Sequence, residues 1–385
     1  MSRKNNSSCE LGFALDLYNA AADTVPSASN LIICPYSVES VLACFLPGTD
    51  GEIHKNLLRL LCPKGRSVTE LCYELFSRTA DNIIQANAVF YDVKATLAAA
   101  YQDALKIYES IHFFSVPFET DPQQTVEAIN NFLLQHSSGN IDDILPRLRL
   151  DDVRESDLIL LSTINFSGAW DFPFDPESTC HRMFYCADGT QRHIPFLNSE
   201  MDYYRSYNVD AQKQTLSPHD PKVLILDISG KNYSVMFLLP EESPDGLRQM
   251  ESSLNPSALI EWRKKSIVSE IMVALPKFRI STSTDLIPCT KALGLADMYR
   301  PSSDMSGMFE HRTLTKVADF AQNTMFDVDE YGIKAATVTI SRNTYTCNYF
   351  PAFEANRPFL LVIWDNNAEF PLFIGRIADP SPMVT

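Results

Sequence analysis

The chain has 385 residues, of which 45% are hydrophobic and 21% charged, so it can bury a sizeable core and wholesale disorder is excluded. Acidic residues outnumber basic residues by 48 to 32, which gives a formal net charge of −16. A surface of this sign repels phosphate and sulfate groups, so nucleic acids, membranes and heparin are not expected as partners.

Two features of the sequence bear on where the protein acts. The first eight residues are polar and lack the apolar middle section of a secretory signal. The nine cysteines are odd in number and include no C-x-x-C pair, which favours reduced thiols in a reducing compartment. We therefore expect a cytoplasmic protein, or one secreted by a route or a leader that this sequence does not show.

The first 150 residues are predicted to be mainly helical. Val38, Val41 and Leu42 recur at helical spacing after Pro35, a residue that suits the first turn of a helix. The same spacing predicts a second helix over 126–133, ending near residue 138.

From about residue 155 onward, strands dominate the prediction. The expected strands are the apolar runs 158–161, 223–226 and 235–239, the half-buried segment 273–278, and a hairpin of 358–362 and 370–374 around Asn366-Asn367. Helices followed by strands predict an α+β fold with more than one sheet. Because no linker or repeat interrupts the chain, we expect one domain over residues 1–385.

No motif for catalysis or metal binding is present. The sequence contains no G-x-S-x-G elbow, no Walker A loop and no H-E-x-x-H helix. Cys180-His181 with Cys186 fits no zinc-site spacing, and the seven histidines are scattered. We expect no catalytic residue, no metal and no cofactor, although a hydrolase triad scattered along the chain stays as a third alternative.

Residues 327–351 do not fit an ordinary element. An acidic opening leads to Gly332, then small and β-branched residues run to Ile340, and a polar stretch ends at Pro351. This would be a long loop, or an exposed strand prone to aggregation. Judged by periodicity alone, the segment fits a plain sheet strand followed by a long turn equally well.

The chain resembles the serpin family over nearly its whole length. The motifs that carry the resemblance occur in the family's order, at residues 34–37 (Cys-Pro-Tyr-Ser), 166–170 (Phe-Ser-Gly-Ala-Trp), 275–278 (Leu-Pro-Lys-Phe), 329–337 (Asp-Glu-Tyr-Gly to Ala-Ala-Thr), 356–359 (Asn-Arg-Pro-Phe) and 370–376 (Phe-Pro-Leu-Phe-Ile-Gly-Arg). The lack of a visible leader, together with Cys347, is most similar to the intracellular, ovalbumin-type branch.

The resemblance implies a fold and a mechanism. It implies a single-domain serpin fold of the α+β class, with N-terminal helices, three β-sheets and an exposed reactive loop over about 332–351. Serpins present their reactive loop to a serine protease as a substrate, so a covalent acyl complex with a serine protease is expected. The chain is also expected to be a monomer and not an enzyme. The alternative is a non-inhibitory serpin that acts as a chaperone, storage or carrier protein.

The resemblance also assigns roles to residues. The implied hinge comprises Glu330, Gly332, Ile333, Lys334, Ala335, Ala336, Thr337, Val338 and Thr339. Side chains alternate along an inserting strand, so the odd-numbered residues from Ile333 face the core, while Lys334 and Arg342 share the outward face. Ile333 and Val338 are bulkier than usual in the family and Lys334 replaces a usual Glu, which we expect to slow insertion.

Two further regions are implied. The shutter, where the main sheet opens, has Cys34, Ser37, Ser162 and Gln322 at the matching positions. Gln322 stands where His is usual, and it could bridge to Ser162 or to the backbone because an amide both donates and accepts. Trp170 lies at the breach, where the loop first meets the sheet, and could serve as a gate or as plain core packing.

The reactive bond is expected between Thr346 and Cys347, 14 residues beyond Gly332. Tyr345-Thr346 is the runner-up, and cleavage after Arg342 is a further alternative. A Thr suits a shallow elastase-like pocket, a Tyr a deep chymotrypsin-like pocket and an Arg a trypsin-like protease.

Overall fold

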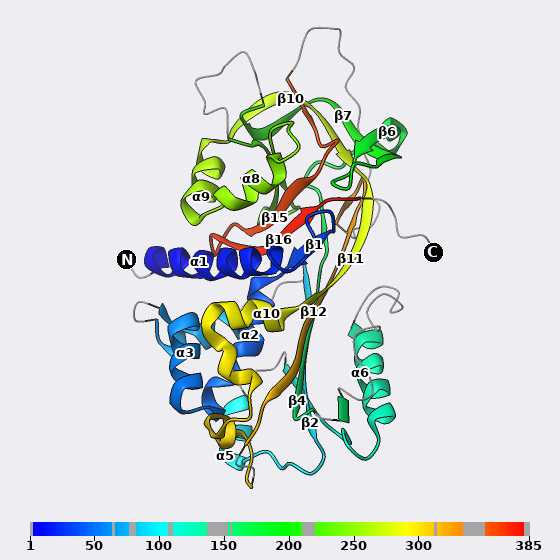
Figure 1. Ribbon diagram of the computed structural model, residues 1–385. Coiled ribbons are helices and arrows are strands. Elements are labelled where there is room, and N and C mark those ends of the chain that lie inside the picture. The colour runs from blue at the N-terminus through cyan, green and yellow to red at the C-terminus, as the bar shows by residue number, and fades with distance from the viewer. Residues whose placement is uncertain are drawn as a thin grey trace.

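The computed structural model describes residues 3–63, 66–76, 82–106, 111–136, 153–154, 156–209, 220–311, 314–333 and 351–380. A long sheet runs down the molecule in Figure 1, with α2, α3 and α10 on one side of it and α6 on the other. The helices are α1 (Arg3–Ala22), α2 (Pro35–Ala43), α3 (Gly51–Leu61), α4 (Val68–Phe76), α5 (Ala99–Leu105), α6 (Pro122–His136), α8 (Gly246–Ser253), α9 (Pro256–Lys265) and α10 (Leu286–Thr290).

The long sheet has seven strands. Its order is β3-β2-β4-β12-β13-β5, and β11 pairs with the other edge of β12. The strands are β2 (Ile83–Asp92), β3 (Ile111–Val116), β4 (Leu158–Phe166), β5 (Gly168–Ala169), β11 (Phe278–Asp285), β12 (Val317–Val328) and β13 (Gly332–Ile333).

Strand β4 is buried along its whole length because both faces of the sheet are covered. Leu158 and Leu160 pack into the main core, while Ile159 and Leu161 pack on the opposite face into a second core. That second core includes Phe132 of α6. The continuous apolar run 158–161 therefore marks a central strand between two helical layers.

The second sheet has nine strands. Its order is β1-β16-β15-β9-β8-β7-β10-β14, and β6 pairs with β7. The strands are β1 (Leu31–Ile33), β6 (Cys180–Tyr185), β7 (Gln191–Tyr207), β8 (Lys222–Asp227), β9 (Tyr233–Leu239), β10 (Ile267–Pro276), β14 (Ala352–Glu354), β15 (Phe359–Asp365) and β16 (Phe370–Ile377).

The three expected sheets are present, but two of them are hydrogen-bonded to each other and form the nine-stranded sheet. The 17-residue strand β7 pairs with β6 and β10 over most of its length, but its last three residues pair with β8. This strand therefore joins two layers by continuous hydrogen bonding. One layer consists of β6, β7, β10 and β14, and the other of β8, β9, β15, β16 and β1. With the seven-stranded sheet they make three layers in one α+β domain.

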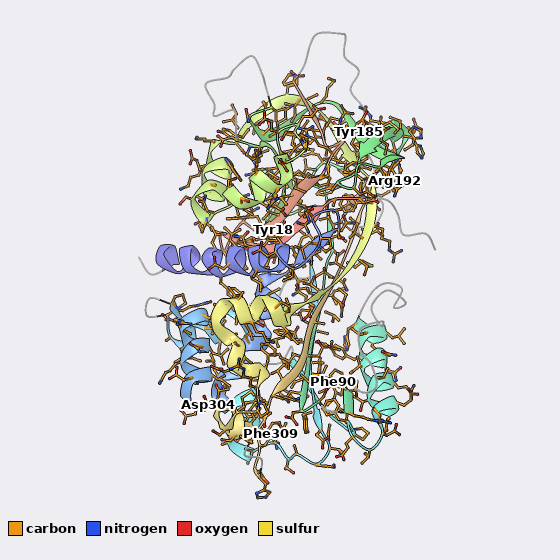
Figure 2. The ribbon with its side chains drawn as sticks, in the orientation of Figure 1. Tyr18, Phe90, Tyr185, Arg192, Asp304 and Phe309 are labelled. Atoms are coloured by element: carbon orange, nitrogen blue, oxygen red, sulfur yellow. The ribbon has the colours of Figure 1, made fainter. Side chains whose placement is uncertain are left out.

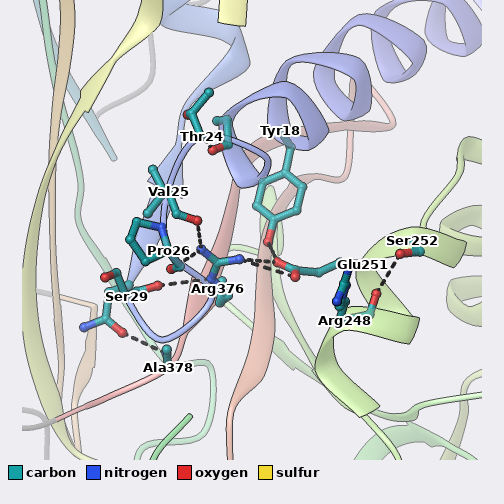
Figure 3. Close-up of polar contacts among 12 residues, drawn as sticks. Tyr18, Thr24, Val25, Pro26, Ser29, Arg248, Glu251, Ser252, Arg376 and Ala378 are labelled. Atoms are coloured by element: carbon teal, nitrogen blue, oxygen red, sulfur yellow. Dashed lines mark hydrogen bonds and ion pairs between the residues drawn. The ribbon is translucent and has the colours of Figure 1, made fainter. Parts of the chain in front are cut away.

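A buried arginine fastens the C-terminal strand to the start of the chain (Figure 3). Arg376 is 1% exposed, and its guanidinium donates to both carboxylate oxygens of Glu251 and to the carbonyls of Ser29, Val25 and Pro26. The Tyr18 hydroxyl donates to the same carboxylate at 2.7 Å. A buried charge is stable only when it is paired and hydrogen-bonded in this way, so Arg376 ties β16 to α8 and to the segment 25–29 that follows α1.

The structure confirms the helix predicted after Pro35, which spans Pro35–Ala43, the helix predicted over 126–133, which lies within Pro122–His136, and the hairpin of β15 and β16. It corrects the segment 273–278, which belongs to two strands in different sheets because β10 ends at Pro276 and β11 begins at Phe278. Three described strands, β1, β2 and β3, also lie within the part predicted to be mainly helical. No described helix is both long enough and apolar enough to cross a membrane.

Candidate functional site

The start of the predicted reactive loop forms the short strand β13 inside the seven-stranded sheet. Ile333 is opposite Val328 of β12 on one side and Gly168 of β5 on the other, and Gly332 is opposite Ala169. Ile333 has no exposed surface. The sheet therefore already contains the first two residues of an additional strand at its upper end.

Below this point, β12 and β4 pair directly with each other. Their parallel register has eight residue pairs, from Val317 opposite Leu158 to Met325 opposite Asn165. A strand that continued downward from Ile333 would have to separate these two strands. This geometry makes the β4–β12 seam the place where the sheet must open.

The turn that leads into β13 is clamped by residues 170–174. The carbonyls of Asp329, Glu330 and Tyr331 accept hydrogen bonds from Trp170 Nε1, Phe174 N–H and Trp170 N–H at 2.8–2.9 Å. Trp170 is 2% exposed, so it packs in the core and holds the turn at the same time. Sequence reasoning selected Trp170 but missed Phe174, which acts through its backbone and carries no sequence signal.

Glu330 is buried at this turn and has two side-chain partners. Its Oε2 accepts from Lys277 Nζ at 2.7 Å, and its Oε1 accepts from the Thr179 hydroxyl at 2.8 Å. Burial acts to raise the pKa of Glu330, but the hydrogen bonds from Lys277, its own backbone and Thr179 outweigh it, so the pKa lies below its ordinary value. Lys277 stands in the 275–278 motif, yet only the fold reveals its partner.

A Glu330→Gln variant is expected to lose about 1–2 kcal/mol of stability at pH 7, because the partly exposed Lys277 loses its charged acceptor. The folded-state pKa of Glu330 is lowered, so its contribution is complete above about pH 4.3 and is lost as the pH falls through the folded value. Thermal unfolding midpoints of both proteins between pH 7 and pH 3 should therefore converge at low pH. A Thr179→Val control should lose less, and a gap that stays constant down to pH 3 would contradict this assignment.

The four shutter residues are brought together at the β4–β12 seam, and all have no exposed surface. Gln322 of β12 bridges to the backbone of Cys34, which precedes α2. Its Oε1 accepts from Cys34 N–H at 2.8 Å, and its Nε2 donates to Cys34 C=O at 2.9 Å. The amide thus makes the backbone bridge that was one of its two predicted options.

The two serines complete a polar link across the seam. The hydroxyls of Ser37 on α2 and Ser162 on β4 are hydrogen-bonded to each other, and Ser37 Oγ donates to Asn87 Oδ1 of β2 at 3.1 Å. Asn87 was missed by sequence reasoning because nothing in β2 marks it as a partner of a helix. Burial raises the pKa of the Cys34 thiol far above its usual value, so this thiol stays protonated.

A Gln322→Ala variant is expected to lose about 2–3 kcal/mol, because it leaves the buried Cys34 N–H without an acceptor and removes a bond to its carbonyl. The thermal unfolding midpoint of the uncleaved protein measures this loss. Gln85→Ala is the matched control, since Gln85 of β2 is only partly buried and its contact with Ser37 Oγ is 3.4 Å. Equal midpoints for Gln322→Ala and the unaltered protein would show that the bridge does not stabilise the seam.

Several predicted site residues lie outside the described part of the chain. These are Lys334, Ala335, Ala336, Thr337, Val338, Thr339, Arg342, Tyr345, Thr346 and Cys347. The reactive bond therefore stays a prediction. Among the residues that are described, no three His, Cys, Asp or Glu side chains gather as a metal site.

Comparison with known proteins gives one family. The family profile described as "Serpin (serine protease inhibitor)" matches residues 9–380. The chain is 29% identical to alpha-1-antiproteinase 2 of Equus caballus over 96% of this chain and 86% of that protein. It is 26% identical to antithrombin-III of Mus musculus over 96% of this chain and 80% of that protein. These relatives support neither the ovalbumin-type branch nor the cytoplasmic location expected from the sequence.

Solved structures give the same fold. Native protease nexin-1 with heparin superposes with a TM-score of 0.83 at 25% identity, covering 98% of this chain and all of that one. A thyroxine-binding globulin complex with thyroxine superposes with a TM-score of 0.81 at 22% identity, covering 98% of this chain and all of that one. The heparin in the first of these structures weakens the argument from net charge that heparin is no partner.

Proposed function

The chain belongs to the serpin family of serine protease inhibitors, and from this premise we propose that it traps a serine protease as a suicide substrate. The observation that carries the proposal is β13, since Ile333 already occupies the position between β12 and β5 that an inserted loop strand would extend. Once β4 and β12 separate, their facing edges would offer backbone partners on both sides of that strand.

The proposed covalent step is acyl transfer. The protease serine attacks the carbonyl of Thr346, the Thr346–Cys347 amide bond breaks, and Cys347 leaves with a new amino terminus. The ester that remains joins the protease to the loop. Insertion of residues from Lys334 onward then carries the protease away from its first contact before water can hydrolyse the ester.

The register of β13 fixes where each inserted residue would lie. Continuing the antiparallel pairing of Val328 with Ile333 places Lys334 opposite Asp327 and Arg342 opposite Asp319. Both cations of the outward face would thus meet an acidic residue across the strand. The sequence alone led us to expect that Lys334 slows insertion, and we now infer that Asp327 of β12 would compensate for it in this register.

This register predicts a charge effect. Lys334→Glu would place two carboxylates opposite each other, at a cost of about 0.2–1 kcal/mol to the inserting strand, and should reduce the fraction of stable complex about two- to fivefold. Adding Asp327→Asn should restore it, whereas Asp319→Asn in the same background should not. Gel densitometry of complex against cleaved product measures the fraction, and rescue by Asp319→Asn alone would refute the register.

The proposed target class is a chymotrypsin- or elastase-like serine protease. The experiment that tests the function is incubation with chymotrypsin, elastase and trypsin, followed by denaturing gels and sequencing of the released C-terminal peptide. A complex that resists SDS, with a new terminus at Cys347, is the expected result. Cleavage of every sample without a complex would refute inhibition, and a complex formed only by cleavage after Arg342 would refute the proposed bond.

The alternative is a non-inhibitory serpin. The neighbour solved with thyroxine has this fold, and Lys334 and Gln322 depart from the usual pattern of inhibitory members. Against it, the segment after Ile333 has neither Pro nor Gly, and its inward positions are small or β-branched. We therefore place inhibition first.

We further propose that the inhibitor acts as a monomer outside the cell and needs no cofactor. The net charge of −16 supports independence from heparin. Retention on a heparin column at physiological salt, or a faster reaction with protease when heparin is added, would contradict that independence. Detection of the protein only within cells that express its gene would contradict the proposed location.

A further inference from the structure

The hairpin of β6 and β7 carries two imidazoles and a thioether on one exposed face; Tyr185 and Arg192 mark this hairpin in Figure 2. Met183 is directly opposite His193 in the strand register, and His181 lies two residues before Met183, so alternation puts all three side chains on the same face. The His181 and His193 ring centroids are 5.3 Å apart with a tilt of 31°. Met183 is 37% exposed, and both histidines are exposed.

This spacing suits a shared metal ion. A metal about 2.0 Å from one nitrogen of each imidazole holds two rings with centroids about 4.5–6 Å apart, which includes the observed separation. A thioether is a soft ligand that favours Cu(I), while imidazole also suits copper. We propose that His181, Met183 and His193 form a surface binding site for Cu(I), independent of the inhibitory role.

The charges around the site do not oppose a cation. The two nearest arginines in the hairpin are both paired, Arg182 with Glu354 at 3.3 Å and Arg192 with Asp379 at 3.6 Å. Each ion pair neutralises a positive charge that would otherwise repel a metal ion. By alternation, Arg182 and Arg192 lie on the other face of the hairpin, so neither paired charge shares the solvent-exposed face of the three proposed ligands.

The sequence analysis considered a different set of possible metal ligands in this region, Cys180, His181 and Cys186. Cys180 alternates with His181 and so lies on the other face of β6, where its sulfur accepts from Asn198 Nδ2 at 3.4 Å, and Cys186 is buried. His193 joins His181 only because the hairpin register brings strands β6 and β7 together. A spacing rule along the chain cannot detect ligands that meet in this way.

A second histidine pair supplies the control. His112 of β3 and His136 of α6 have ring centroids 5.7 Å apart, but they pack against Phe114 and Phe132. The ring contacts of this pair are with phenylalanines, so it is the matched imidazole control. Met272, 40% exposed on β10, is the matched methionine control.

The test is an anaerobic titration of the full-length chain with Cu(I), using bicinchoninate as the competing chromophoric chelator. Cys180→Ser and Cys347→Ser form the background, which removes as rival ligands the Cys180 thiol, exposed among the described cysteines, and the Cys347 thiol. One equivalent should bind, and His193→Gln and Met183→Leu should each weaken binding about tenfold or more. His112→Gln and Met272→Leu should leave it unchanged. Unchanged affinity in His193→Gln, or an equal loss in His112→Gln, would overturn the site.

Discussion

An Ile333→Arg variant is expected to be cut by the target protease yet to lose the stable complex almost entirely. Ile333 is fully buried between β12 and β5, so an arginine there would have to place an unpaired charge in the core as the strand inserts. Burying such a charge costs several kcal/mol, which slows insertion and lets water hydrolyse the acyl ester first. The fraction of protease trapped should fall at least about tenfold, as measured by the number of inhibitor molecules consumed per protease inactivated.

The neighbouring residue provides the control for this variant. Lys334 is predicted to face outward, so Lys334→Ala should keep the trapped fraction within about twofold of the unaltered protein. The uncleaved Ile333→Arg protein is expected to release the two-residue strand β13 from the core and to keep the rest of its fold, which its thermal unfolding midpoint checks. A variant that traps protease as well as its parent would mean that insertion does not pass through the position of Ile333.

Cleavage of the reactive bond is expected to produce a large gain in thermal stability. The uncleaved protein is proposed to be kinetically trapped, since its loop cannot pair fully with β12 while the loop is intact. After cleavage, the inserted strand gains hydrogen bonds on both sides and buries its inward face. The unfolding midpoint should rise from the ordinary range of about 45–65 °C to above about 90 °C.

The Ile333→Arg protein serves as the comparison, because it should be cleaved without a comparable rise in midpoint. Calorimetry or circular dichroism of intact and nicked samples measures both values. Nicked protein with an unchanged midpoint would favour the non-inhibitory alternative, since no strand would then have been added.

Much of the fold could be predicted because its signals are local. The apolar run 158–161 predicted a buried strand, and the turn around Asn366-Asn367 predicted the hairpin of β15 and β16. The break between β10 and β11 was missed because the apolar residues Val273, Leu275 and Phe278 favour one half-buried strand, although the step of three residues from Leu275 to Phe278 breaks the alternation. The chain changes sheets at Pro276–Phe278, and the buried apolar positions shift there from Val273 and Leu275 to Phe278 and Ile280, out of phase by one residue.

The order of residues along the chain determined the helices, the strands and the family motifs, since each depends on neighbours a few positions apart. Only the tertiary structure decided which distant residues meet: Glu330 with Lys277 and Thr179, Gln322 with the Cys34 backbone, and His181 with His193. The physical reason is that alternation along a strand fixes a face, while strand order and register across the sheet fix the partner. Those two properties arise from packing of the whole core, which no short window of sequence contains.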